Sequence, residues 1–119
     1  MDLTFCQVTA FVARWRRLGL TDEDLQALEA QLASRPSAGV VIVGTGGLRK
    51  LRFGPPSRGG GKRGGTRVIY AYFPDHDTIY LFLIYPKNEQ DDLTPAQKTQ
   101  CRQLVAEIQS LLKSQARHE

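Results

Sequence analysis

The chain has 119 residues, of which 41% are hydrophobic and 24% charged, and its 16 Lys or Arg against 12 Asp or Glu give a net charge of +4. These values predict one compact domain over residues 1–119, and they exclude intrinsic disorder, collagen and a disulfide scaffold. No apolar run reaches the roughly 18 residues of a membrane span, and the first residues lack the pattern of a signal peptide, so we expect a cytoplasmic protein without membrane contact. Cys6 and Cys101 lie in apolar patterns without CxxC spacing, which favours two buried thiols.

The N-terminal part of the chain predicts one strand followed by two helices. Residues 3–8 alternate weakly, as a short strand does, and apolar residues at helical spacing then continue to Gly19, which suits a helix end. A second helix is expected to begin at Thr21, because Thr21 and Asp24 resemble a capping box, and to end at Pro36.

The middle of the chain predicts an interrupted strand and a flexible basic loop. Residues 40–43 form a β-branched run, a glycine-rich break follows, and the strand resumes over residues 48–53. The period of two places Lys50 and Arg52 on the same face of that strand. Residues 54–65 hold two prolines, six glycines and three basic side chains, which predicts a mobile connection.

The C-terminal part predicts a hairpin and a last helix. Residues 66–73 and 78–85 are strong strands joined by the turn at 74–77, and the second strand is apolar on both faces, as a central strand is. Thr94 and Gln97 resemble a second capping box that starts a long amphipathic helix. The predicted order β-α-α-β-β-β-α is typical of a small α+β domain whose helices pack on a mainly antiparallel sheet.

Positive charge is concentrated in one stretch of the sequence. No acidic residue occurs from Ala30 to Pro74, and nine of the eleven glycines lie between Gly44 and Gly65. Such a block indicates an anionic partner, most often nucleic acid, rather than an ordinary solvated surface, in which the two signs mix. The basic residues of this stretch are Arg35, Arg49, Lys50, Arg52, Arg58, Lys62, Arg63 and Arg67.

Neither a nucleotide-binding loop nor a metal site is favoured by the motifs. The third glycine of a G-x-G-x-x-G pattern falls at Arg49, and the Gly-Lys pair at 61–62 is followed by Arg63 instead of Ser or Thr. Glu89, Asp91 and Asp92 form an acidic cluster, but they precede a helix start, where acidic side chains are favourable for electrostatic reasons alone. We therefore expect no cofactor and no metal.

Basic residues alone can serve phosphodiester cleavage. The reaction needs an acceptor for the proton of the ribose 2′-hydroxyl, cations that stabilise charge on phosphorus, and an acid for the departing 5′-oxygen. Lysine can fill any of these roles, and the fork of arginine suits phosphate. On composition alone, the simpler alternative is favoured, in which the cations only bind the RNA backbone. The residues that the predicted strands bring toward one side of the sheet are Lys50, Arg52, Arg67, Tyr85 and Lys87.

Three sequence blocks resemble the HigB-type branch of the RelE toxin superfamily. The blocks read GTGGLRKLR at 44–52, GKRGGTRVIY at 61–70, and IYPKNE at 84–89 followed by Asp92-Leu93. The resemblance implies the toxin of a type II toxin–antitoxin system, a ribosome-dependent and metal-independent mRNA endoribonuclease that inhibits translation. Its implied partners are mRNA and rRNA on the ribosome, and a cognate antitoxin with a helix-turn-helix domain.

The resemblance also implies roles for individual residues. Arg52 stands where some relatives have a lysine as candidate general base, so proton acceptance is left to Lys50, to water or to positioning by the ribosome. Lys87 is the candidate acid, because Asn88 replaces an arginine of some relatives. Tyr85 either stacks on a base or is a tyrosine at the edge of the core, and Glu89 is expected to orient Lys87 or Arg67 through a salt bridge. The implied catalytic residues are Lys50, Arg52, Arg67 and Lys87, and the implied RNA- or ribosome-binding residues are Arg49, Arg58, Lys62, Arg63 and Tyr85.

Two alternatives are kept beside this hypothesis. The first is a non-catalytic RNA- or ribosome-binding protein, which binds many RNAs in a salt-sensitive manner without cutting them. The second is a metal-dependent nuclease that uses Glu89, Asp91 and Asp92.

Overall fold

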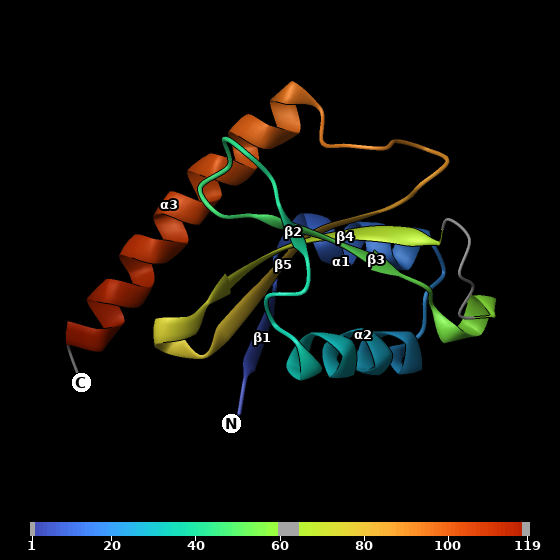
Figure 1. The fold of residues 1–119 in the computed structure, drawn as a ribbon, viewed down its shortest axis with the longest axis horizontal. Coiled ribbons are helices and arrows are strands. Elements are labelled where there is room, and N and C mark those ends of the chain that lie inside the picture. Colours follow the sequence, from blue (N-terminus) through green and yellow to red (C-terminus); the bar gives the residue numbers. More distant parts are fainter. Residues whose placement is uncertain (1, 60–64, 118–119) are drawn as a thin grey trace.

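A five-stranded sheet forms the centre of the molecule, with helices on both of its faces (Figure 1). The computed structural model describes residues 2–59 and 65–117. Within these ranges no helix is both long and apolar enough to cross a membrane. The elements are β1 (Thr4–Gln7), α1 (Thr9–Arg17), α2 (Asp22–Ser34), β2 (Val40–Val41), β3 (Arg49–Phe53), β4 (Thr66–Phe73), β5 (Thr78–Pro86) and α3 (Pro95–Arg117), with short 3-10 turns η1 (Pro56–Arg58) and η2 (Pro74–His76).

The strand order across the sheet is β1-β5-β4-β3-β2, in which β1 runs parallel to β5 and all other neighbours are antiparallel. This confirms the predicted α+β class and the central position of β5. The register shifts between Ile69, which pairs with Leu83, and Tyr70, which pairs with Leu81, so that Phe82 is an extra residue in β5.

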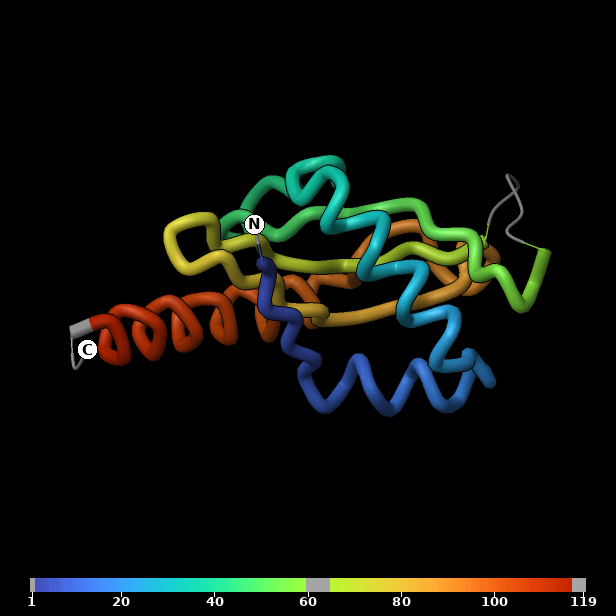
Figure 2. Tube along the Cα trace, turned by 90° about the horizontal axis from the view of Figure 1, so that it is seen from below, coloured from blue at the N-terminus to red at the C-terminus, as the bar shows by residue number. Residues whose placement is uncertain are grey.

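Two hydrophobic cores lie on opposite faces of the sheet. One includes Phe11 and Trp15 of α1 and Leu28 of α2, and the other includes Val105 and Ile108 of α3. In Figure 2 the chain of α1 lies well to one side of the strands. Because both faces are covered, β4 and β5 are largely buried on both sides, and for β5 this agrees with the apolar pattern that predicts a central strand.

Both predicted capping boxes are present at the helix starts. The Thr21 hydroxyl accepts from the amide of Asp24 at 3.1 Å, and the Asp24 carboxylate accepts from the amide of Thr21 at 2.9 Å. Thr94 and Gln97 exchange the corresponding hydrogen bonds at 3.0 and 3.1 Å at the start of α3. These local patterns therefore set where the two helices begin.

The number of strands differs from the prediction. Four strands, not three, follow the helices, because residues 40–43 do not continue into the next strand. Gly44, Gly46 and Gly47 all have positive φ, so the chain turns back there, and Val40 and Val41 pair antiparallel with β3 as a separate edge strand.

The described start of the basic loop at 54–65 is held by hydrogen bonds to other parts of the chain. Ser57 in η1 donates from its amide and its hydroxyl to the Asp24 carboxylate at 2.9 and 2.6 Å. The Arg58 guanidinium donates to the carbonyl of Leu18. Residues 60–64, which include Lys62 and Arg63, lie outside the described residues.

The buried carboxylate of Asp24 predicts acid lability. Burial by itself raises the pKa of Asp24, but hydrogen bonds from Ser57 and Thr21 outweigh this effect and lower the pKa from 3.8 to about 2. A pKa below that of the unfolded chain stabilises the fold above about pH 4, and this contribution is lost as the pH falls toward about 2. Urea unfolding between pH 5 and pH 2 should show this loss, and Asp24→Asn should flatten it. An unchanged slope in that variant would contradict the assignment.

Candidate functional site

A row of polar side chains crosses β3, β4 and β5 on the face covered by α3. Arg52 is the register partner of Arg67, and Arg67 is the register partner of Tyr85. Cross-strand partners point to the same face of a sheet, so these three side chains are neighbours. Lys50 lies two residues from Arg52 along β3, on the same face, opposite Ile69. The sequence-predicted convergence of these residues is present in the fold.

Arg67 is the buried member of the row. Only 6% of Arg67 is exposed, whereas Arg52 is exposed. The Arg67 guanidinium donates to the carbonyl of Thr66 at 3.3 Å. It also lies close enough to Tyr85 for its positive charge to lower the pKa of the tyrosine hydroxyl. A buried arginine cation is fixed in position before any ligand arrives, which is the arrangement that stabilises developing negative charge.

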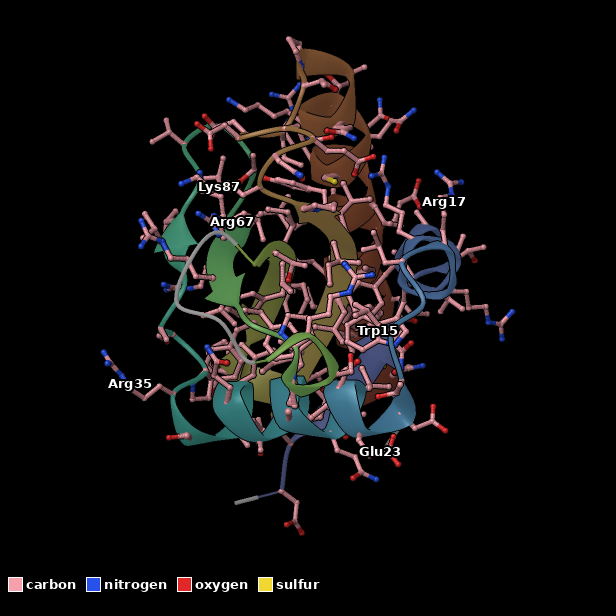
Figure 3. All side chains as sticks on the ribbon, turned by 90° about the vertical axis from the view of Figure 1, so that its right-hand side faces the viewer. Trp15, Arg17, Glu23, Arg35, Arg67 and Lys87 are labelled. Carbon is pink, nitrogen blue, oxygen red and sulfur yellow. The ribbon has the colours of Figure 1, made fainter. Side chains whose placement is uncertain are left out.

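Lys87 lies at the same end of the sheet as Arg67. Figure 3 shows the two side chains close to each other where β5 ends. The Lys87 amide donates to the carbonyl of Gly65 at 3.3 Å, which fixes the backbone beside the start of β4, while its side chain is exposed. Lys87 therefore adds an accessible ammonium next to a buried guanidinium.

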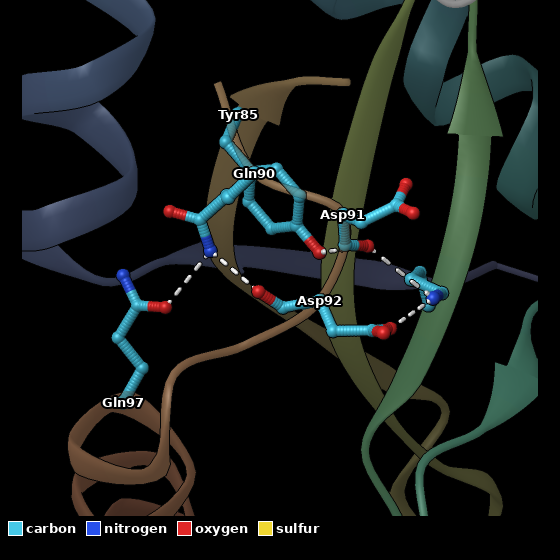
Figure 4. Close-up of polar contacts among 6 residues, drawn as sticks. Tyr85, Gln90, Asp91, Asp92 and Gln97 are labelled. Carbon is cyan, nitrogen blue, oxygen red and sulfur yellow. Dashed lines mark hydrogen bonds and ion pairs between the residues drawn. The ribbon is translucent and has the colours of Figure 1, made fainter. Parts of the chain in front are cut away.

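Lys50 is held by the chain segment that follows β5. Its ammonium lies 2.5 Å from a carboxylate oxygen of Asp92 and 3.5 Å from the carbonyl oxygen of Asp91 (Figure 4). The side chain of Lys50 is 29% exposed and that of Asp92 is 72% exposed. The hydrogen bond and the charge of Lys50 lower the pKa of Asp92, so its carboxylate is ionised at neutral pH.

Tyr85 belongs to the core edge and not to the exposed surface. Its ring is fully buried, and its hydroxyl donates to the carbonyl of Asp91 at 3.5 Å. Burial raises the pKa of Tyr85 to about 12, with Asp92 adding to the rise and Arg67 opposing it. Of the two roles that the sequence left open for Tyr85, this burial favours the tyrosine at the edge of the core over stacking on an RNA base, because a buried ring offers no free face.

The segment from Gln90 to Gln97 is tied together by side-chain amides. The Gln90 amide nitrogen donates to the carbonyl of Asp92 at 2.9 Å and to the Gln97 side-chain oxygen at 3.0 Å. Asp91 and Asp92 therefore do more than precede a helix start, because they also hold Lys50. The contact between Lys50 and Asp92 joins positions 42 residues apart, and no local pattern in the sequence indicates it.

Several residues expected in the site lie elsewhere or form other contacts. Arg49 points to the opposite face of β3 from Lys50 and donates to the carbonyl oxygens of Ser37 and Gly39 at 3.0 and 2.8 Å. Arg58 binds a carbonyl near the end of α1. Glu89 is exposed in the turn after β5, where its amide donates to the Pro86 carbonyl at 3.0 Å, and among the described residues it forms no ion pair with Lys87.

The carboxylates of the segment after β5 are not arranged as metal ligands. Within residues 2–59 and 65–117, no group of three or more His, Cys, Asp or Glu side chains is placed to hold a metal ion. Asp92 instead faces the ammonium of Lys50. Cys101 is a buried free thiol, as predicted, whereas the free thiol of Cys6 is only partly buried.

Comparison with known proteins gives one family and one fold. The family model described as "RelE toxin of RelE / RelB toxin-antitoxin system" matches residues 7–118. The crystal structure of the intact E. coli RelBE toxin–antitoxin complex is similar with a TM-score of 0.50 and 14% identity, covering 70% of this chain and 94% of that chain. A free-state structure of E. coli toxin RelE carrying two arginine-to-alanine changes is similar with a TM-score of 0.51 and 13% identity, covering 76% of this chain and 90% of that chain. Since the structural likenesses show the fold and the family model spans nearly the whole sequence, the chain belongs to the RelE toxin family of the RelE/RelB toxin–antitoxin system.

Proposed function

We propose that this toxin is a ribosome-dependent, metal-independent mRNA endoribonuclease that inhibits translation in the cytoplasm. The observation that carries the proposal is the cationic row on the α3 face, where Arg52 and Arg67 are register partners. Lys50 and Lys87 flank this row from β3 and from the end of β5. Four cations around one face suit a phosphodiester, whose negative charge increases as the 2′-hydroxyl attacks phosphorus.

The proposal assigns tasks in the reaction to three of the four cations. Arg67, buried and preorganised, stabilises the charge on phosphorus, and the exposed fork of Arg52 binds a phosphate oxygen beside it. Lys87 donates a proton to the departing 5′-oxygen. Because both arginines stay protonated and Lys50 is bound to a carboxylate, the 2′-hydroxyl proton passes to water or to a group that the ribosome positions.

The proposed partners follow from the family. One of the similar structures is a toxin–antitoxin complex, which supports neutralisation of this chain by a cognate RelB-type antitoxin. The three sequence blocks favour the HigB-type branch, and with it an antitoxin that carries a helix-turn-helix domain. Arg58, Lys62 and Arg63 in the basic loop are proposed to contact ribosomal or messenger RNA backbone.

Expression without the antitoxin is expected to arrest growth, and the purified toxin should cut mRNA on programmed ribosomes but leave the same naked mRNA intact. The cut end should carry a cyclic or 3′-phosphate, since the 2′-hydroxyl is the nucleophile. Primer extension and end-group analysis measure both results.

Two controls separate this function from its alternatives. Glu89→Gln and Asp91→Asn should retain cleavage, whereas a metal-dependent nuclease that uses these carboxylates would lose it. Salt-sensitive binding to ribosomes with intact message would instead support the non-catalytic RNA-binding alternative and contradict the proposed activity.

A further inference from the structure

We propose that Asp92 is a positioning residue for the cationic face, which holds the Lys50 ammonium beside the Arg52–Arg67 row. This inference rests on the proposed nuclease function and identifies a further residue on which its rate depends. It is carried by the 2.5 Å contact between the Lys50 ammonium and the Asp92 carboxylate. Asp92 does not touch the reacting atoms in this proposal and acts through Lys50.

The position of Lys50 requires an external constraint. Lys50 and Arg52 alternate on β3, so their Cα atoms are about 7 Å apart, and the long stem of lysine allows its ammonium to point away from the row. Asp92 and the carbonyl of Asp91 accept from this ammonium, which leaves one N–H for a ligand. The two acceptors therefore select one direction for a flexible side chain.

The segment that supplies these acceptors is itself held by the core and by α3. The hydroxyl of Tyr85, whose ring is fully buried, binds the carbonyl of Asp91 at 3.5 Å. Gln90 binds the carbonyl of Asp92 at 2.9 Å and the side chain of Gln97 in α3 at 3.0 Å. Figure 4 shows the contacts of Tyr85, Gln90 and Gln97 together on one side of Asp91 and Asp92. The exposed Asp92 carboxylate thus projects from a fixed backbone toward Lys50.

Asp91 offers a matched control for Asp92. Both are exposed neighbours with the same charge, but Asp91 reaches Lys50 through its backbone carbonyl and Asp92 through its carboxylate. Asp91→Asn and Asp92→Asn therefore change the net charge equally, and only the second removes the ion pair. A difference between the two variants isolates positioning from general electrostatics.

The test is single-turnover cleavage of mRNA on programmed ribosomes. We expect Asp92→Asn to lower the maximal rate roughly tenfold without weakening binding to the ribosome, because misplaced groups slow chemistry more than they weaken association. Asp91→Asn should remain within about twofold of the wild type, and Asp92→Glu should recover part of the loss. In a Lys50→Met background, Asp92→Asn should have no further effect, since coupled residues are non-additive. Thermal unfolding of each variant controls for stability.

Each contrary outcome has a separate meaning. Equal rates for Asp91→Asn and Asp92→Asn, a faster Asp92→Asn variant, or full additivity with Lys50→Met would overturn the positioning role while the nuclease function stands. The faster variant would mean that Asp92 competes with RNA phosphate for Lys50. A wild-type toxin that cuts no message on ribosomes would overturn the proposed function, and the inference with it.

Discussion

Replacement of Arg67 by glutamine is expected to abolish growth arrest and to lower cleavage on programmed ribosomes by about 100-fold or more, the loss seen when one preorganised charge-stabilising donor is removed. Arg67 is 6% exposed and is the register partner of both Arg52 and Tyr85, so its guanidinium is placed in the row before substrate binds. A neutral amide at this position can donate a hydrogen bond but carries no charge for phosphorus. Growth curves and single-turnover cleavage measure the effect.

Two further substitutions make the Arg67 result specific. Arg67→Lys keeps the charge and loses the planar fork, so it should fall between the wild type and the glutamine variant. Arg49→Gln removes a cation from the opposite face of the sheet, where Arg49 binds the carbonyls of Ser37 and Gly39, and it should cut mRNA normally with a lower melting temperature. A folded Arg67→Gln protein with full toxicity would refute the assignment.

Asp24→Ala is expected to destabilise the fold by about 3 kcal/mol, because the change removes the acceptor of three partly buried hydrogen bonds. The Asp24 carboxylate accepts from the amides of Thr21 and Ser57 and from the Ser57 hydroxyl, at 2.9, 2.9 and 2.6 Å. The same side chain therefore caps α2 and anchors η1 at the start of the basic loop. Urea unfolding at neutral pH measures the difference in the free energy of unfolding.

Neighbouring substitutions define what the Asp24 effect means. Ser57→Ala removes only the hydroxyl and should cost about 1 kcal/mol. Glu23→Ala removes an exposed acidic side chain from the same first turn, where it interacts only with the helix dipole. This change should lower the free energy of unfolding by about 0.5 kcal/mol at most. If Asp24→Ala were no worse than Glu23→Ala, the buried network would contribute little to stability.

Much of the fold could be predicted because its signals are local. The capping boxes at Thr21 and Thr94 involve residues three positions apart, and the structure contains both. The alternation of β3 likewise separates Lys50 and Arg52 from Leu51, and Leu51 lies in the core beneath α1 and α2. Period and spacing suffice in these cases because neighbouring residues satisfy each other's hydrogen bonds or share one face.

Other features of the fold depend on contacts between distant parts of the chain, which local patterns do not indicate. The β-branched run at 40–43 predicts the first part of a strand that resumes at 48–53, but the glycine turn folds the chain back, so that Val40 and Val41 pair with β3 as a separate strand. The start of the loop at 54–65 also depends on a distant residue, because Ser57 finds its acceptor in Asp24, 33 residues earlier.

Local patterns in the chain were sufficient to predict the α+β class, the helix starts, the acid-free basic stretch and the strands that carry Lys50, Arg52 and Arg67. The burial of Tyr85, the separation of Arg49 from the cationic row and the ion pair of Lys50 with Asp92 emerged only on folding. The physical reason is that periodicity and capping act over a few residues. Burial and ion pairing instead depend on which strands become neighbours and on what the segment between β5 and α3 covers.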